Sequence, residues 1–303
     1  MKRLARVLLL ATLLGVAGGC NTTSSSMNAP LQSYTLDYAT PTDPALQSSL
    51  ATTDTALRAK YAMTTDQTAV GLLDLQTLHL AMVHPDREEY AASVAKIGIL
   101  LAYFQLNPTA ATHLEATTRH ELGLMIKASS NEMASQFSHE LGLQPIQAVL
   151  NADNFYDASH GGGLWVGKHY GVGTERIGSP VGDNSHAATV RQLLRFYLML
   201  TQGKLVSPAA SQTMREIFRS PEIPADNLKF VKALAGRKVQ ILRKWGSWED
   251  WLHDTAVITG PGRHYILVAL THHPRGDDYL EDLAVAVDDL MIQTARPKSS
   301  QTH

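Results

Sequence analysis

The chain has 303 residues, of which 44% are hydrophobic and 18% charged, and its formal net charge is −2 at pH 7. This balance is typical of a globular protein long enough for one sizeable core or two closely packed lobes. The sequence has no excess of basic residues that would point to nucleic-acid binding, and no acidic block that would indicate a disordered tail.

The first twenty residues have the order of an export signal. Basic residues precede an apolar run over 7–17 that is too short to span a bilayer. Small residues then lead to Cys20, which resembles a bacterial lipoprotein box, although Ala17 stands where that motif prefers leucine. We predict a lipoprotein-type signal over 1–20, with Cys20 lipidated and the protein anchored in the bacterial cell envelope, facing the periplasm. A plain signal peptide cleaved nearby is the alternative.

Residues 21–43 are rich in Ser, Thr, Asn and Pro, a composition that predicts a flexible tether. Cys20 is the only cysteine of the chain. The exported domain therefore has no disulfide and no cysteine-ligated metal, and its stability must come from packing.

Regular elements are predicted through the first half of the chain by the spacing of apolar residues. A helix is expected over 44–62, followed by two short strands. From Ser93 the sequence is apolar almost all round, as in a helix that crosses a core, and Asn107-Pro108 ends it. The expected strands are 68–75 and 79–83, and further helices are expected at 114–127, 131–141 and 145–150.

The segment 151–185 is glycine-rich and has little periodicity, so we predict a long irregular loop, which usually has a functional reason to exist. Helical spacing returns over 186–202, and Ser207-Pro208 predicts the start of a helix over 208–219. The C-terminal pattern predicts strands at 237–247, 253–259 and 263–272 and a helix at 277–293.

Strand patterns therefore lie at both ends of the chain, with helices between them. This order predicts an α+β fold in which both ends form one mixed sheet, covered by the first and last helices. A single domain would span 44–293, and 294–303 would be a tail. Within it, 44–90 and 204–293 would form an α/β lobe and 91–203 an inserted helical lobe.

A serine and a lysine three residues apart, Ser93 and Lys96, begin the apolar helix. This spacing places both on one face of a helix. A serine nucleophile needs a base, and a lysine serves only if its pKa falls from about 10.4 to roughly 7–8. Burial in the apolar core at 97–101 would lower that pKa. The N–H of Ser93, at a helix N-terminus, would face a developing oxyanion.

A second motif, Ser129-Ser130-Asn131, follows a predicted helix. Ser129 is placed to relay a proton to a leaving nitrogen. Asn131 is placed to orient Lys96 and to donate to a substrate amide.

The third motif, Lys244-Trp245-Gly246, lies on a predicted strand, where Lys244 and Gly246 share a face. A second cation would lower the pKa of Lys96 further. Gly246 would let a substrate backbone approach, and the N–H of Ser247 would be the second oxyanion donor.

The motifs S-x-x-K, S-x-N and K-x-G, in this order on this layout, resemble the penicillin-recognising serine enzymes, most of all their class A β-lactamase-like branch. The resemblance covers 44–293. It implies acylation of Ser93 by a β-lactam or an acyl-D-Ala-D-Ala-type amide, with no cofactor or metal. It further implies catalytic roles for Ser93, Lys96, Ser129 and Lys244, and substrate contacts from Asn131, Trp245, Gly246 and Ser247.

Three departures from the family pattern concern the helical lobe, the carboxylate anchor and deacylation. Ser129 follows Ser93 by only 36 positions (129 − 93), which implies a trimmed helical lobe. Trp245 stands where the family has Ser or Thr, so the hydroxyl that helps hold a substrate carboxylate is missing. Counting back along the loop puts Leu164 at the position of the deacylating glutamate and Lys168 at that of its asparagine partner. The substitutes that we cannot rank are Asp153, Asp157, His160, His169 and Glu175.

If no substitute serves, the acyl-enzyme lingers, as in a penicillin-binding protein. Three functions therefore stay open. The first is β-lactam hydrolysis, the second a D-Ala-D-Ala-type peptidase or esterase, and the third a non-hydrolysing penicillin-binding or sensor lipoprotein. The expected partner in each case is a small-molecule or peptide amide.

Overall fold

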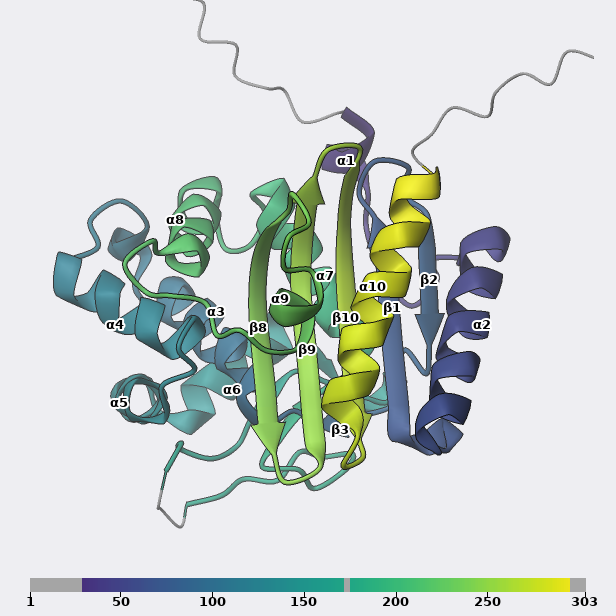
Figure 1. Cartoon of the computed structure of the whole chain (residues 1–303). Coiled ribbons are helices and arrows are strands. Elements are labelled where there is room, and N and C mark those ends of the chain that lie inside the picture. Colours follow the sequence, from purple (N-terminus) through teal and green to yellow (C-terminus); the bar gives the residue numbers. More distant parts are fainter. Residues whose placement is uncertain (1–28, 172–174, 295–303) are drawn as a thin grey trace, which may run out of the picture.

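A five-stranded sheet lies at the centre of the computed structural model, which describes residues 29–171 and 175–294 (Figure 1). Its strand order is β2-β1-β10-β9-β8. The strands are β1 (Thr68–Asp74), β2 (Leu80–Val83), β8 (Gln240–Trp248), β9 (Trp251–Gly260) and β10 (Arg263–His272). The two ends of the chain meet where β1 pairs with β10, so the expected sheet built from both ends is confirmed.

All pairings in this sheet are antiparallel, which differs from the mixed sheet that we expected. The reason is the connectivity of the strands. Short hairpins join β1 to β2, β8 to β9 and β9 to β10, and a hairpin makes its two strands antiparallel.

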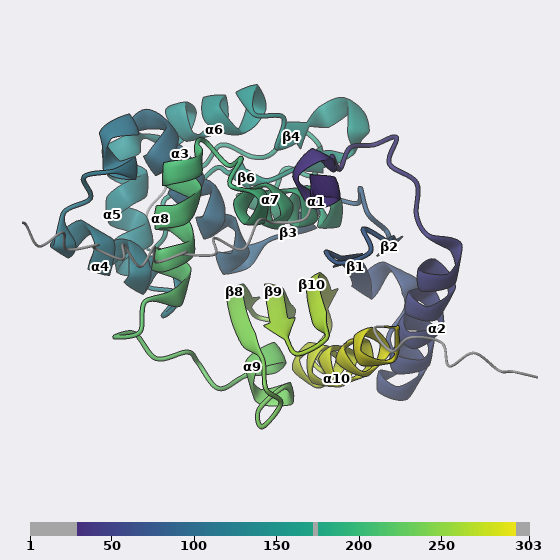
Figure 2. The ribbon, with the colours of Figure 1, turned by 90° about the horizontal axis from the view of Figure 1, so that it is seen from above.

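Helices cover both faces of the sheet (Figure 2). The first face carries α2 (Pro44–Tyr61), α9 (Lys229–Ala233) and α10 (Gly276–Thr294), and α7 (Val190–Gln202) lies on the second. Asp43 caps α2 by accepting a hydrogen bond from the N–H of Leu46 at 2.8 Å, and Pro44 occupies its first turn. Leu50 and Leu283 are fully buried against the first face of the sheet.

The remaining large helices form a helical lobe beside the sheet (Figure 1). They are α3 (Lys96–Leu106), α4 (Ala116–Ile126), α5 (Asn131–Leu141), α6 (Leu143–Ala152) and α8 (Pro208–Arg219). The expected lobe boundary at 203/204 is wrong, because α7 packs on β1 and β10 of the sheet whereas α8 packs on α4. The apolar faces of these two helices, and not their order in the chain, decide which layer each joins.

Short elements interrupt the loop expected at 151–185, whose described residues are otherwise irregular, as expected. A small sheet contains β3 (Glu89–Tyr90), β6 (Trp165–Val166) and β7 (His186–Ala188), and β4 (Tyr156–Asp157) pairs with β5 (Gly162–Gly163). The 3₁₀ helices are η1 (Thr65–Gln67), η2 (Ala92–Ala95), η3 (Pro108–Ala111) and η4 (Ala158–His160). Strands of two or three residues are too short to show periodicity in the sequence.

The described part of the expected tether, residues 29–43, packs on the domain, so the tether prediction is wrong there. It contains α1 (Ala29–Ser33), and the side chains of Leu31 and Leu36 are buried. The side-chain amide of Gln202 donates to the carbonyls of Leu31 and Tyr34 at 2.6 and 2.7 Å. Burial of two leucines and these hydrogen bonds offset the entropy of ordering the segment.

The predicted signal over 1–20, Cys20 and most of the tail at 294–303 lie outside the described residues. Within the described residues, no helix is long and apolar enough to cross a membrane.

Candidate active site

Ser93 and Lys96 lie where η2 continues into α3, between the helical lobe and β8. Ser93 is partly exposed, whereas Val94, Ala95 and Lys96 are buried. Ala92, just before the serine, has a φ of +46°, a left-handed conformation that a non-glycine residue seldom adopts. Such backbone strain is concentrated at functional sites.

Lys96 reaches the second motif with its ammonium nitrogen. Its Nζ donates to the carbonyl oxygen of Ser129 at 2.6 Å and to Oδ1 of Asn131 at 2.7 Å, and lies 3.3 Å from Oγ of Ser129. Ser129 itself has a left-handed φ of +55°. The structure thus brings together residues 33 and 35 positions apart in the chain, as the motif order led us to expect.

Lys244 approaches the same hydroxyl from β8. Its Nζ donates to Oγ of Ser129 at 2.8 Å and to the carbonyl oxygen of Trp245 at 2.6 Å. The Ser129 hydroxyl therefore lies between two lysine nitrogens. Such an arrangement can pass a proton from one side of the site to the other.

Both lysines are fully buried, and burial is the main cause of their lowered pKa values. It lowers the pKa of Lys96 to about 7. The pKa of Lys244 is well below its ordinary value because of burial and then because of the charge on Lys96. A lysine with a pKa near 7 is partly neutral at physiological pH and can accept a proton.

A cavity of about 360 Å³ opens beside Ser93. Its lining includes Asn131, Ser247 and Trp248, together with the loop residues Lys168, His169 and Tyr170 and the nearby Tyr90 and His186. Among the described residues that line it, none is a carboxylate. Nor do the described residues hold any group of three or more His, Cys, Asp or Glu side chains that could bind a metal ion.

Gly246 brings β8 against the turn that carries the serine. A Cβ on Gly246 would lie 3.0 Å from the backbone nitrogens of Ser93 and Val94 and from the carbonyl oxygen of Ala91. We expected this glycine to admit a substrate backbone. The structure shows instead that it admits the chain's own η2 backbone, so its first role is to let the strand approach Ser93.

Trp245 does not line the cavity, which differs from the substrate contact that the resemblance implied. Nζ of Lys244 lies 5.0 Å from the centroid of its ring. Its indole N–H donates to Oδ2 of Asp226 at 2.9 Å, and Nζ of Lys229 lies 5.3 Å from the ring centroid. The partly exposed indole is thus held by Asp226 and lies near two buried lysines.

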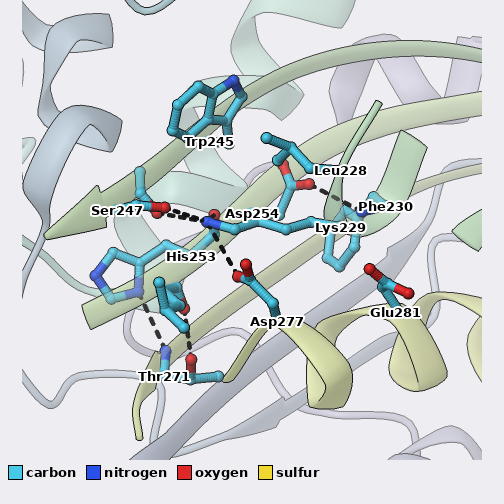
Figure 3. A network of polar contacts seen from close by, with 12 residues as sticks. Leu228, Lys229, Phe230, Trp245, Ser247, His253, Asp254, Thr271, Asp277 and Glu281 are labelled. Carbon is cyan, nitrogen blue, oxygen red and sulfur yellow. Dashed lines mark hydrogen bonds and ion pairs between the residues drawn. The ribbon is translucent and has the colours of Figure 1, made fainter. Parts of the chain in front are cut away.

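Lys229 is a further functional candidate that the sequence did not indicate (Figure 3). It is 1% exposed, and its Nζ donates at 2.7 Å both to the hydroxyl of Ser247 and to the carbonyl oxygen of Gly246. Asp277 lies 3.6 Å from the same nitrogen, and burial lowers the pKa of Lys229. A third buried lysine therefore fixes the end of β8 and the Ser247 hydroxyl, which lies at the cavity.

Of the five loop residues that we could not rank, only His169 lines the cavity. Its ring stacks on His139 at 3.6 Å and its Nδ1 lies 2.9 Å from the Ser138 hydroxyl. Glu175 is exposed and lies 3.8 Å from His169. The other three, which contact other partners or line another pocket, are Asp153, Asp157 and His160.

Tyr170 is the loop residue that meets Lys96. Its hydroxyl donates to the carbonyl oxygen of Ala92 at 2.9 Å, and Nζ of Lys96 lies 4.6 Å from its ring centroid. The ring also stacks on His186, with a 4.3 Å centroid distance. Leu164 stands where a count along the loop placed the deacylating glutamate of class A β-lactamases. Its side chain is fully buried and lies 3.4 Å from the position that a Cβ on Gly98 would have.

Comparison with known families gives one match. Residues 112–291 match the beta-lactamase enzyme family. That range contains 180 residues (291 − 112 + 1), which is more than half of the chain, and it begins after Ser93 and Lys96. No curated protein matches the sequence.

Several solved structures share the fold. A β-lactamase from Sphaerobacter thermophilus DSM 20745 is 16% identical, with a TM-score of 0.63 over 80% of this chain and 97% of its own. PBP-A is 17% identical, with a TM-score of 0.62 over 86% of this chain and 100% of its own. A leucine-to-glutamate mutant of PBP-A, solved as an acyl-enzyme complex with penicillin G, is 17% identical, with a TM-score of 0.63 over 82% and 97%. These similarities show a β-lactamase/transpeptidase-like fold.

Proposed function

Since the chain belongs to the β-lactamase enzyme family, we propose that it is a serine acyl hydrolase acylated at Ser93 by a β-lactam or an acyl-D-Ala-D-Ala-type amide. The observation that carries this proposal is the state of Lys96. Its amine is fully buried, has a pKa of about 7, and is held by Ser129 and Asn131 three residues from Ser93.

Acylation proceeds by proton transfer and attack in the proposed mechanism. The neutral Lys96 amine takes the proton of the Ser93 hydroxyl, and Oγ bonds to the substrate carbonyl carbon. The backbone N–H groups of Ser93 and Ser247 stabilise the oxyanion. As the C–N bond breaks, the leaving nitrogen receives a proton from the Ser129 hydroxyl, which is replenished through Lys96 and Lys244.

Positive charge around the cavity favours an anionic substrate. Lys168 lines the cavity, and Nζ of Lys229 donates to the Ser247 hydroxyl. Ser247 backed by Lys229 thus offers a hydroxyl for a substrate carboxylate, a role that Trp245 does not fill. Charge-assisted hydrogen bonds of this kind are about twice as strong as neutral ones.

Deacylation is the slow step in this proposal. The described lining of the cavity has no carboxylate to activate a water. His186 is a poor base because burial lowers its pKa to about 3. The acyl-enzyme should therefore persist. Formation of such an adduct is supported by the leucine-to-glutamate mutant of PBP-A, which was solved as an acyl-enzyme complex with penicillin G.

Two other functions follow from the same acylation chemistry. A D-Ala-D-Ala-type peptidase or esterase would release its acyl group to water or another acceptor. A penicillin-binding or sensor lipoprotein would keep it. Turnover distinguishes them, because only the first releases product repeatedly.

Nitrocefin turnover measured beside intact-mass analysis with benzylpenicillin tests the proposal. We expect one covalent adduct per chain and little steady-state turnover. Ser93→Ala should abolish the adduct and lower any hydrolysis by roughly 10³–10⁶-fold while the protein stays folded. Acylation retained by Ser93→Ala would refute the nucleophile, and fast nitrocefin turnover would refute slow deacylation.

We also propose that Cys20 is lipidated and anchors the protein in the cell envelope, a proposal supported by the order of residues in 1–20. Metabolic labelling with a palmitate analogue tests it. Label on the wild type and none on Cys20→Ala is expected, and an unlabelled wild type would contradict the anchor.

A further inference from the structure

A second cavity has a volume of about 640 Å³. It lies between helix α8, the C-terminal end of α7, the first residues of β8 and the C-terminal half of β9. It is larger than the cavity beside Ser93 and shares no lining residue with it. Volumes of about 300–1,000 Å³ are typical of sites that bind small molecules.

The floor of this second cavity is apolar. Leu200 of α7, Phe218 of α8, Leu242 of β8 and Val257 of β9 line it, and none of them is more than 7% exposed. An alkyl chain inside the cavity would pack against these side chains.

Three cations also line the cavity: Lys127, Arg215 and Arg219. Its described lining contains no Asp or Glu. Nζ of Lys127 donates to the carbonyl oxygen of Ser220 at 2.6 Å. The Arg215 guanidinium donates at 2.6 Å to the carbonyl oxygen of Leu200 and also at 2.6 Å to the amide oxygen of Gln212. These partners are all neutral.

The nearest glutamates are engaged elsewhere. Glu216 accepts a hydrogen bond from Arg119 at 2.9 Å, and Glu222 lies 4.0 Å from Nδ1 of His120. Burial lowers the pKa values of Lys127 and Arg215, an effect that the charges of Glu222 and Glu216 oppose in part. The cavity therefore combines an apolar floor with positive charge that no carboxylate of its lining neutralises.

We propose that this cavity binds an anionic amphiphile, a medium-chain fatty carboxylate, whose alkyl chain covers the apolar floor and whose carboxylate lies among Lys127, Arg215 and Arg219. Two arginines suit this ligand because a guanidinium binds a carboxylate through two parallel hydrogen bonds. The site is separate from Ser93, so the proposal does not depend on the proposed acylation.

Isothermal titration calorimetry of the mature protein with decanoate tests the proposal, with 1-decanol and decyltrimethylammonium as uncharged and cationic probes. Arg219→Glu reverses an exposed charge of the cavity, and Ala225→Trp fills its mouth from an exposed position. The matched controls are Lys232→Glu and Ala158→Trp, two exposed positions that do not line it.

Decanoate should bind the wild type and bind each cavity variant about tenfold more weakly or worse, the loss expected for one charge-assisted hydrogen bond. Both controls should bind as the wild type does. The proposal is overturned if decanoate does not bind, if decanol or the cation binds equally well, or if the cavity variants match their controls. Because the substituted positions are exposed, circular dichroism should show all four variants folded.

Discussion

Replacing Lys96 by methionine separates the two consequences of burying this amine. The unfolded chain holds a proton on Lys96 up to its ordinary pKa of 10.5, whereas the folded chain releases it near pH 7. Because the unfolded state then binds more protons between these values, the folded state gains stability as the pH rises from 7 towards 10.5. Lys96→Met has no such proton and lacks this gain.

The size of the effect follows from the pKa values. Over pH 7 to 9 the native amine goes from half protonated to almost fully neutral, while the unfolded amine stays charged. The free energy of unfolding of the wild type should therefore rise by about 2 kcal/mol relative to Lys96→Met over this range. Below pH 6 both forms of Lys96 are charged and the difference should be flat. The pKa of Lys244 is lowered mainly by burial, which both proteins share, and only secondarily by the charge on Lys96, which Lys96→Met removes.

Urea unfolding at several pH values measures the stability difference, and the rate of acylation by benzylpenicillin measures the chemistry. In the wild type that rate should rise with pH with a midpoint near 7, the pKa of the base. Lys96→Met should slow acylation by roughly 10²–10⁴-fold above pH 7, and by less at lower pH, where Lys96 of the wild type is itself protonated. A stability difference that does not change between pH 7 and 9 would refute the lowered pKa, and unchanged acylation would refute the base.

Three further substitutions test how the fold supports the site. Gly246→Ala should lower the free energy of unfolding by about 1–3 kcal/mol through overpacking, because its Cβ would lie 3.0 Å from the backbone nitrogen of Ser93. The same substitution should slow acylation. Wild-type stability and wild-type acylation would contradict the close approach of β8 to Ser93. Asp288→Ala should lower the free energy of unfolding, measured with urea, by about 3–5 kcal/mol, because the buried Arg263 guanidinium, 2.5 Å away, loses its partner. A loss below about 1 kcal/mol, which is typical of a surface ion pair, would show that the pair is solvated. Trp248 lines the Ser93 cavity and is 59% exposed. Trp248→Ala should therefore change the free energy of unfolding by no more than about 0.5 kcal/mol but slow acylation by aromatic penicillins about two- to tenfold. Unchanged acylation kinetics would show that Trp248 is not part of the substrate-binding surface.

Elements with strong local signals could be predicted closely from the sequence. Helix α8 begins at Pro208 as expected, because the Ser207 hydroxyl caps it by accepting from the N–H of Ala210 at 3.1 Å. β10 spans the expected residues 263–272, set by its long apolar run and the turn before it. In contrast, α1 and α9 have only five residues each, too few to show helical periodicity.

The site shows the same division between local and long-range information. Motif order predicted that Lys96, Ser129 and Lys244 meet, and the hydrogen bonds of Ser129 join all three. Lys229 has no such motif, since its role depends on a contact with Ser247 that arises only when α9 packs on β8. Trp245 was expected at the substrate on the resemblance alone, whereas its indole donates to Asp226 and lies beside Lys229 and Lys244.

The loop at 161–171 shows why counting along a sequence fails where the backbone is irregular. The count gave Leu164 the glutamate position, but β5 and β6 on either side hold Leu164 in the core. The residue that reaches Lys96 is Tyr170, six positions later. The Tyr170 hydroxyl donates to the carbonyl oxygen of Ala92. Burial raises the pKa of this phenol well above its ordinary value, so Tyr170 stays neutral near neutral pH. It therefore cannot act as a base there or carry the negative charge that a carboxylate would. The loop therefore brings an aromatic ring and no base to Lys96, and the cavity lining that the structure describes holds no carboxylate, so we expect an acyl-enzyme that persists.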